Sequence, residues 1–138
     1  MRDNTVNATE LVTRYYAAFN AGDMDTFLDL LHEDVAHDIN QGHREVGRHA
    51  FRRFMERMNR CYRERLSDIV VMTAADGSRA AAEFIVHGEY LATDAGLPEA
   101  KGQHYVLRAG AFFDIRDGRI ARVTNYYNLD HWLKQVQG

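Results

Sequence analysis

The spacing of hydrophobic residues changes once along the chain and divides it into a helical part and a strand part. In the first part, apolar side chains recur every three or four positions, the period of a helix with one buried face. This spacing predicts helices over about residues 9–21, 23–31 and 47–61. From Leu66 onward the period is two, which is typical of strands with one buried face.

Local signals support these boundaries. Thr9 is suited to cap the first helix, and Asp23 to cap the second. Asn20-Ala-Gly22 should end the first helix, because Gly and Asn tolerate the left-handed backbone found at helix ends. The pairs Asp76-Gly77 and Asp117-Gly118 indicate hairpin turns.

The strand part predicts a meander that follows the helices. Strands are expected over about residues 35–40, 66–74, 79–91, 103–116 and 119–128, with a short helix over 130–136. Helices followed by antiparallel strands indicate an α+β fold. We expect three N-terminal helices packed on a curved, mostly antiparallel sheet, closed by a short C-terminal helix.

Composition narrows the class of protein. The chain has 138 residues, which fits a single domain over 1–138, and 46% hydrophobic with 27% charged residues is ordinary for a soluble protein. A net charge of −3 gives no general attraction to nucleic acid or anionic membrane. We see no signal peptide and no transmembrane run, and Cys61 has no internal partner, so we expect a cytoplasmic protein without nucleic-acid or membrane partners.

One segment carries a family resemblance. Arg14-Tyr15 is followed by Asn20-Ala-Gly-Asp23, a second helix, and a His37-Asp38 pair at the start of a strand. This order resembles the opening of the nuclear transport factor 2-like superfamily, and within it the ketosteroid isomerase and SnoaL-like polyketide cyclase branches. The resemblance implies a cone-shaped α+β barrel whose apolar pocket holds acid–base residues.

The resemblance also implies roles for single residues. Tyr15 matches the tyrosine that donates a hydrogen bond to the substrate oxygen as it gains charge, although a packing role on a core helix is the alternative. The general base of the isomerases matches Ile39 without gaps, and Asp38 lies one residue earlier. Either a bulge turns Asp38 into the pocket, or His37 shares the pocket face with Ile39 and is the base.

The chain departs from the isomerases at their second oxyanion donor, whose place falls near Gly110 or Ala111. Neither side chain can donate a hydrogen bond, which argues against steroid isomerisation. His104 or Tyr126 could substitute. On the last strand, Asn125 and Tyr126 lie on opposite faces, and the sequence does not say which face is concave. The residues expected to contact substrate are Ile39, His104, Asn125 and Tyr126.

These observations favour a cofactor-free acid–base enzyme that acts on a small apolar carbonyl compound, with catalytic residues Tyr15, His37 and Asp38. The alternative is a non-catalytic ligand-binding or dimerisation module of the same fold. Histidines crowd residues 32–49, but their spacing matches no metal motif, so we expect no metal. We also expect a homodimer through the outer face of the sheet, because the long strands carry apolar residues on both faces.

Overall fold

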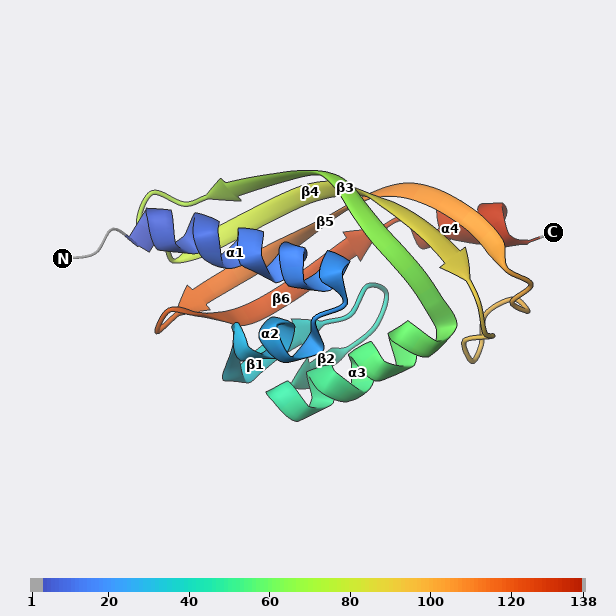
Figure 1. Ribbon diagram of the computed structural model, residues 1–138, viewed down its shortest axis with the longest axis horizontal. Coiled ribbons are helices and arrows are strands. Elements are labelled where there is room, and N and C mark those ends of the chain that lie inside the picture. Colours follow the sequence, from blue (N-terminus) through green and yellow to red (C-terminus); the bar gives the residue numbers. More distant parts are fainter. Residues whose placement is uncertain (1–3, 138) are drawn as a thin grey trace.

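The computed structural model describes the backbone of residues 4–137 and the side chains from Ala8 onward. The described residues form an α+β fold in which three helices precede the long strands (Figure 1). The elements in chain order are α1 Asn4–Ala21, α2 Met24–Asp29, β1 Leu31–Asp38, β2 Arg44–Val46, α3 Arg48–Cys61, β3 Tyr62–Thr73, β4 Arg79–Tyr90, β5 Gln103–Arg116, β6 Arg119–Tyr127 and α4 Leu129–Val136.

The six strands of the described chain form one mixed sheet in the order β2-β1-β6-β5-β4-β3. Neighbouring strands are antiparallel except β1 and β6, which run parallel. The expectation of a curved, mostly antiparallel sheet with a short C-terminal helix is confirmed. The short strand β2 was not predicted, and β1 begins at Leu31, a residue predicted to lie in the second helix. Short apolar runs such as the one at Leu30 and Leu31 do not distinguish a helix from a strand.

The turn between α1 and α2 has largely the structure that the sequence predicts. Gly22 has a φ of 70° directly after α1, and the Asp23 carboxylate accepts a hydrogen bond from the Thr26 amide at 3.2 Å to cap α2. Thr9 lies inside α1, so its predicted role as N-cap is wrong. Asn20 has a second function, because its amide exchanges two hydrogen bonds of 3.0 and 2.9 Å with the Leu66 backbone and ties α1 to β3.

The sheet has an inner face that packs against the helices and an outer face that does not. Figure 1 shows α1 lying across the curved sheet, with α2 and α3 on the same side. Inner-face side chains of the central strands are buried in alternation and join the core of α1 and α3. They include Ala80, Ala82, Phe84, Val86, Leu107, Ala111, Phe113 and Val123. None of the helices among the described residues is long and apolar enough to cross a membrane.

Candidate functional site

His37 lies on the inner face of β1 and is enclosed by aromatic rings. Its ring stacks on Phe51 at 4.1 Å between centroids and meets the edge of Phe54 at 4.6 Å. The side chain is 1% exposed, and neither ring nitrogen has a hydrogen-bond partner among the described residues. Burial lowers the pKa of His37 to about 4, although the neighbouring charge of Asp38 acts in the opposite direction. His37 is therefore neutral at neutral pH.

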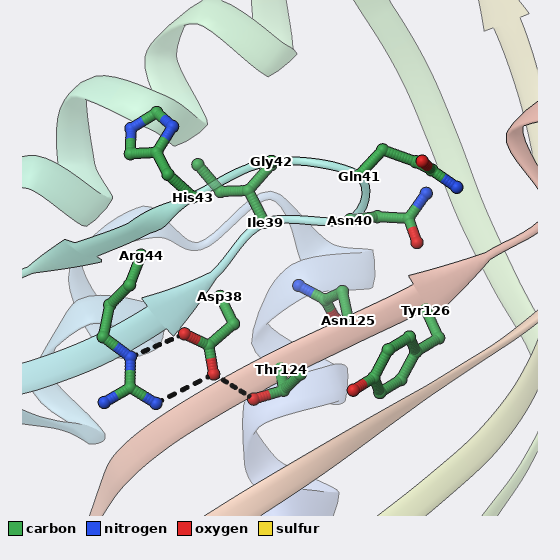
Figure 2. Close-up of a pocket in the computed structure, with 10 residues that line it drawn as sticks. All are labelled: Asp38, Ile39, Asn40, Gln41, Gly42, His43, Arg44, Thr124, Asn125 and Tyr126. Carbon is green, nitrogen blue, oxygen red and sulfur yellow. Dashed lines mark hydrogen bonds and ion pairs between the residues drawn. The ribbon is translucent and has the colours of Figure 1, made fainter.

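Asp38 lies on the outer face of the same strand. Figure 2 shows its carboxylate between the Arg44 guanidinium and the Thr124 hydroxyl, with hydrogen bonds of 2.6 and 3.0 Å from Arg44 and 2.6 Å from Thr124. The hydrogen bonds from Arg44 hold its pKa at about 2 against the opposing effect of burial, and those from Thr124 and the charge of Arg122 act in the same direction. The pairing of β1 with β6 is irregular between Leu31 and Ala36, and this irregularity does not turn Asp38 inward.

Tyr15 belongs to the apolar part of the interior. Its ring stacks on Phe27 at 4.4 Å and meets Phe113 edge-on at 5.6 Å, and burial raises its pKa well above the ordinary value. The rings of Phe27 and Phe51 continue this cluster toward His37. Among the described contacts, Tyr15 meets neither His37 nor Asp38, so the structure does not bring the three predicted catalytic residues together.

The residues predicted to contact substrate are divided between the two faces. Asn125 is half-buried and shares the inner-face phase of Val123 on β6. Tyr126 is on the outer face, 58% exposed, with its ring 5.8 Å from Phe112. His104 is exposed and pairs across the sheet with Glu89, next to the inner-facing Tyr105.

A hollow of about 330 Å³ lies where the loop after β1 separates from β6 (Figure 2). Ile39 lines it from the loop. Asn125 and Tyr126 line it from β6. It therefore includes three of the four residues that were predicted to contact substrate. Its lining is Asp38, Ile39, Asn40, Gln41, Gly42, His43, Arg44, Thr124, Asn125 and Tyr126.

A second group of polar residues lies on the inner face, at the end of the sheet where α3, the β4–β5 loop and α4 meet. Its centre is Glu64, whose carboxylate accepts a 2.5 Å hydrogen bond from the Tyr105 hydroxyl. These two residues lie on either side of Gly88 in the sheet. A Cβ at Gly88 would collide with the Tyr105 ring, so the glycine allows the ring to cross β4 and reach Glu64.

Glu64 combines solvent contact with an apolar environment. Its side chain remains exposed, yet the surrounding protein raises its pKa by desolvation, and the hydrogen bond from Tyr105 offsets only part of this effect. No cation within the described residues contributes to this balance. A carboxylate whose pKa is shifted in this way is a candidate functional group.

Two further pairs surround Glu64 and Tyr105. The Tyr62 hydroxyl donates to the Asp94 carboxylate at 2.8 Å, and the Arg57 guanidinium lies 3.8 Å from the same carboxylate. Burial and the charge of Glu64 raise the pKa of Tyr105, whereas a hydrogen bond from Trp132 of α4 lowers it. We call Tyr62, Glu64, Asp94, Tyr105 and Tyr127 the polar cluster, because their charges and hydrogen bonds influence one another.

The polar cluster was missed in the sequence, although a signal was present. Glu64 lies two residues before Leu66, and Tyr105 two residues before Leu107, so both occupy the apolar phase of their strands. A polar residue in that phase near a strand end marks a place where the interior is polar. Among the described residues, no group of three or more His, Cys, Asp or Glu side chains could hold a metal ion.

Known structures resemble this chain along almost its whole length. A proposed polyketide cyclase from Pseudomonas putida is 73% identical, with a TM-score of 0.93, and the match covers 94% of this chain and 97% of that one. A proposed polyketide cyclase from Xanthomonas campestris is 60% identical, with a TM-score of 0.94 and coverage of 97% and 99%. A third, from Silicibacter, is 53% identical with a TM-score of 0.94, covering 96% of each chain.

More distant structures share the fold alone. An NTF2-like protein from Burkholderia pseudomallei is 15% identical with a TM-score of 0.81, and the match covers 96% of this chain and 98% of that one. None of the curated proteins matches the sequence. The family model described as a SnoaL-like domain matches residues 12–123. The chain therefore belongs to the SnoaL-like family, within the NTF2-like cone fold.

Proposed function

We propose that this protein is a cofactor-free acid–base enzyme of the isomerase or cyclase type, which moves a proton on a small apolar carbonyl compound. The SnoaL-like family and the proposed polyketide cyclases among its relatives support isomerase- or cyclase-type chemistry in general. The finer proposal rests on one observation, the Glu64 carboxylate on the inner face, which accepts a hydrogen bond from the Tyr105 hydroxyl and has a pKa raised by desolvation. A carboxylate with a raised pKa is a stronger base and a more useful acid near neutral pH.

The reaction follows from this carboxylate. Ionised Glu64 removes a proton from the carbon next to the substrate carbonyl, and the electron pair moves onto the carbonyl oxygen as an enolate. In an isomerisation, protonated Glu64 returns the proton to another carbon. In a cyclisation, the enolate carbon attacks a second carbonyl carbon of the same molecule, and the new alkoxide takes the proton from Glu64. Tyr105 holds the carboxylate in one orientation by its 2.5 Å hydrogen bond.

Of the three residues predicted to be catalytic, His37 has the environment that best suits proton transfer or ligand binding. It is neutral, buried, and free at both nitrogens to contact a ligand, so we keep it as a proposed proton-transfer or ligand-binding residue. Asp38, with a pKa of about 2 and an ion pair to Arg44, is a weak base and fits a structural role. Tyr15 fits the packing role that the sequence left open. Asn125, on the inner face, remains a candidate for substrate contact.

The proposal is tested by hydrogen–deuterium exchange at carbon, because exchange needs only the first proton transfer. Small saturated and unsaturated ketones are incubated with the protein in D2O, and loss of the signal of the proton next to the carbonyl is followed by NMR. We expect Glu64→Gln to lose about 10²- to 10⁴-fold of the enzymatic rate. The matched control is Glu83→Gln, because Glu83 is exposed on the outer phase of β4.

Tyr105→Phe refines the same experiment. Removal of the hydrogen bond that lowers the pKa of Glu64 should move the acid limb of the pH–rate profile to higher pH. A Glu64→Gln protein that exchanges as fast as the wild type would overturn the proposal. Absence of exchange for every ketone in the wild type, together with saturable ligand binding, would favour the non-catalytic module.

A further inference from the structure

The sheet opens between β1 and β6 at the end that lies near the β5–β6 turn. Between the pair Leu31–Ile120 and the pair Ala36–Arg122, β1 has four residues and β6 has one. The extra residues of β1 cannot all pair with β6, so the strand bulges away from it. A hollow of about 450 Å³ lies at this bulge, and we call it the bulge hollow. Its lining is His32, Glu33, Arg48, Asp117 and Arg119.

Arg48, the first residue of α3, lines this hollow with a cation that has no counter-charge. Its Nη2 donates a 2.5 Å hydrogen bond to the Leu31 carbonyl at the start of the bulge. Its Nε is buried, and the structure gives it no hydrogen-bond partner and no ion pair within the described part of the chain. A partly buried cation without an anion is costly, because protein replaces the water that would otherwise solvate it. An anion in the hollow would supply both the missing charge and an acceptor.

The position of Arg48 on its helix adds to this cost. A cation in the first turn is disfavoured by the helix dipole, whose N-terminal end is positive. The first turn of α3 has no acidic residue to offset this effect, and its N-cap, Gly47, has no side chain to cap the helix. Arginine at this position therefore does not stabilise the helix that it begins, which argues for a role in the hollow instead.

Two further donors line the bulge hollow. The Arg119 guanidinium donates a 3.1 Å hydrogen bond to the Asp29 carbonyl and lies 3.8 Å from the Asp29 carboxylate. The Nδ1 atom of His32 accepts the Asp34 backbone N–H at 3.1 Å. The proton of the neutral ring is therefore on Nε2, where it can be donated.

The two carboxylates of the hollow limit the size of an anion that can bind. Both Glu33 and Asp117 are exposed. Asp117 already lies 3.7 Å from the His32 Nε2 and 3.9 Å from the Arg116 Nε. The Glu33 carboxylate has no ion pair with any described residue, so its charge opposes an anion at Arg48. A small anion can approach the arginine, whereas an extended polyanion would meet both carboxylates.

From this arrangement we infer that the bulge hollow binds a small oxyanion, a carboxylate or phosphate group, through Arg48 with Arg119 and His32. The site is separate from the polar cluster. Ile115 pairs with Ile120 at the hollow, whereas Tyr105 lies ten residues earlier on β5, about 30 Å along the strand. The inference therefore does not rest on the proposed function.

The test is an NMR titration of the isotope-labelled protein with sodium acetate and, separately, with sodium phosphate, at constant ionic strength. The Arg48 Nε–H signal is observed directly and is assigned by its loss in Arg48→Gln. We expect each addition to shift this signal until it saturates, and the anion that binds more tightly identifies the group as carboxylate or phosphate. In Arg48→Gln, followed through the backbone amides of the hollow, binding should weaken about 10- to 100-fold, as loss of a hydrogen bond to a charged group predicts.

The neighbouring charges should act in opposite directions. Glu33→Gln removes an opposing charge and should strengthen binding about two- to fourfold, whereas Arg119→Gln should weaken it by a similar factor. Arg119→Gln also remains informative if Arg48→Gln fails to fold. The matched control is Arg53→Gln, since Arg53 is exposed on the same helix and lies outside the hollow, and it should bind like the wild type. An Arg48 signal that neither anion shifts overturns the inference, and so does equal binding by the wild type and Arg48→Gln.

Discussion

The two faces of the sheet give neighbouring residues opposite environments, and β1 shows this most clearly. His37 points into the interior, lies against the Phe51 and Phe54 rings, and has no polar partner among the described residues. Asp38, the next residue, is on the outer face with Arg44 and Thr124 as partners. Both pKa values are lowered, but that of His37 by burial and that of Asp38 by hydrogen bonds. One step along a strand therefore changes the chemistry that a residue can perform.

The same alternation separates Phe113 from Phe112 on β5. Phe113 is completely buried and contacts the Tyr15 and Tyr16 rings of α1. Phe112 is 47% exposed and contacts only the Tyr126 ring among the aromatic residues described. The inner face thus contains the core and the proposed site, whereas the outer face combines ion pairs with exposed apolar side chains. The comparison of the two faces can be tested by changing one residue of each pair.

The largest effect is expected for the phenylalanines. Phe113→Ala should lower the free energy of unfolding by about 3–5 kcal/mol, because it removes a buried ring and leaves a cavity between α1 and the sheet. Phe112→Ala is the matched control, with an expected loss of under about 1 kcal/mol for a half-exposed residue. Urea denaturation followed by circular dichroism measures both. Equal losses in the two variants would contradict the assignment of the faces.

Much of the fold could be predicted because hydrophobic period and turn chemistry act locally. The Asp117-Gly118 turn has positive φ at both residues, as a tight hairpin requires, and β5 has the predicted bounds. Capping by Asp23 is equally local. The parallel pairing of β1 with β6 was missed, because it joins Leu31 to Ile120 across most of the chain. No local pattern encodes a contact over that distance.

The candidate site was harder to predict for the same reason. The resemblance directed attention to Tyr15, His37 and Asp38, but the environment of each depends on side chains from other elements. Tyr15 meets Phe113 of β5, and Asp38 meets Thr124 of β6. The contact of Glu64 with Tyr105 requires three strands in register and a glycine between them. The charge and the partners of a side chain on the inner face depend on tertiary structure, so the sequence alone did not identify the proposed base.

His37 provides the next largest expected effect. Its pKa is about 4 in the folded protein, against an ordinary 6.5. This difference corresponds to a pH-dependent part of the free energy of unfolding of roughly 3 kcal/mol. Because the unfolded chain takes up the proton and the folded chain does not, this stability is fully present above pH 6.5 and is lost as the pH falls toward 4. The measurement is the free energy of unfolding in urea at several values between pH 7 and 4.

His37→Phe should remove this part of the pH dependence, because phenylalanine fills a similar space and has no proton to gain. His49→Phe is the control, since His49 is exposed on α3. The Asp38 contribution falls in a different window, since its folded pKa of about 2 lies below the ordinary 3.8 and its stability is lost only as the pH falls from 3.8 toward 2. A wild-type slope between pH 6.5 and 4 that persists in His37→Phe would contradict the buried, neutral histidine.

The smallest expected effect concerns the outer face, which we propose to be the surface of a homodimer. Its exposed apolar side chains are Val70, Met72, Val106, Phe112 and Tyr126. No helix covers these residues among the described elements, so a second copy of the chain would remove them from water. Sedimentation equilibrium at micromolar concentration should give twice the 15.9 kDa of one chain. Phe112→Ala should weaken the dimer by about 1 kcal/mol, which corresponds to a roughly fivefold higher dissociation constant. Phe54→Leu is the control and should leave the dissociation constant unchanged, because Phe54 belongs to α3 on the inner side of the sheet. A wild-type monomer at that concentration would show that the apolar residues of this face are simply exposed.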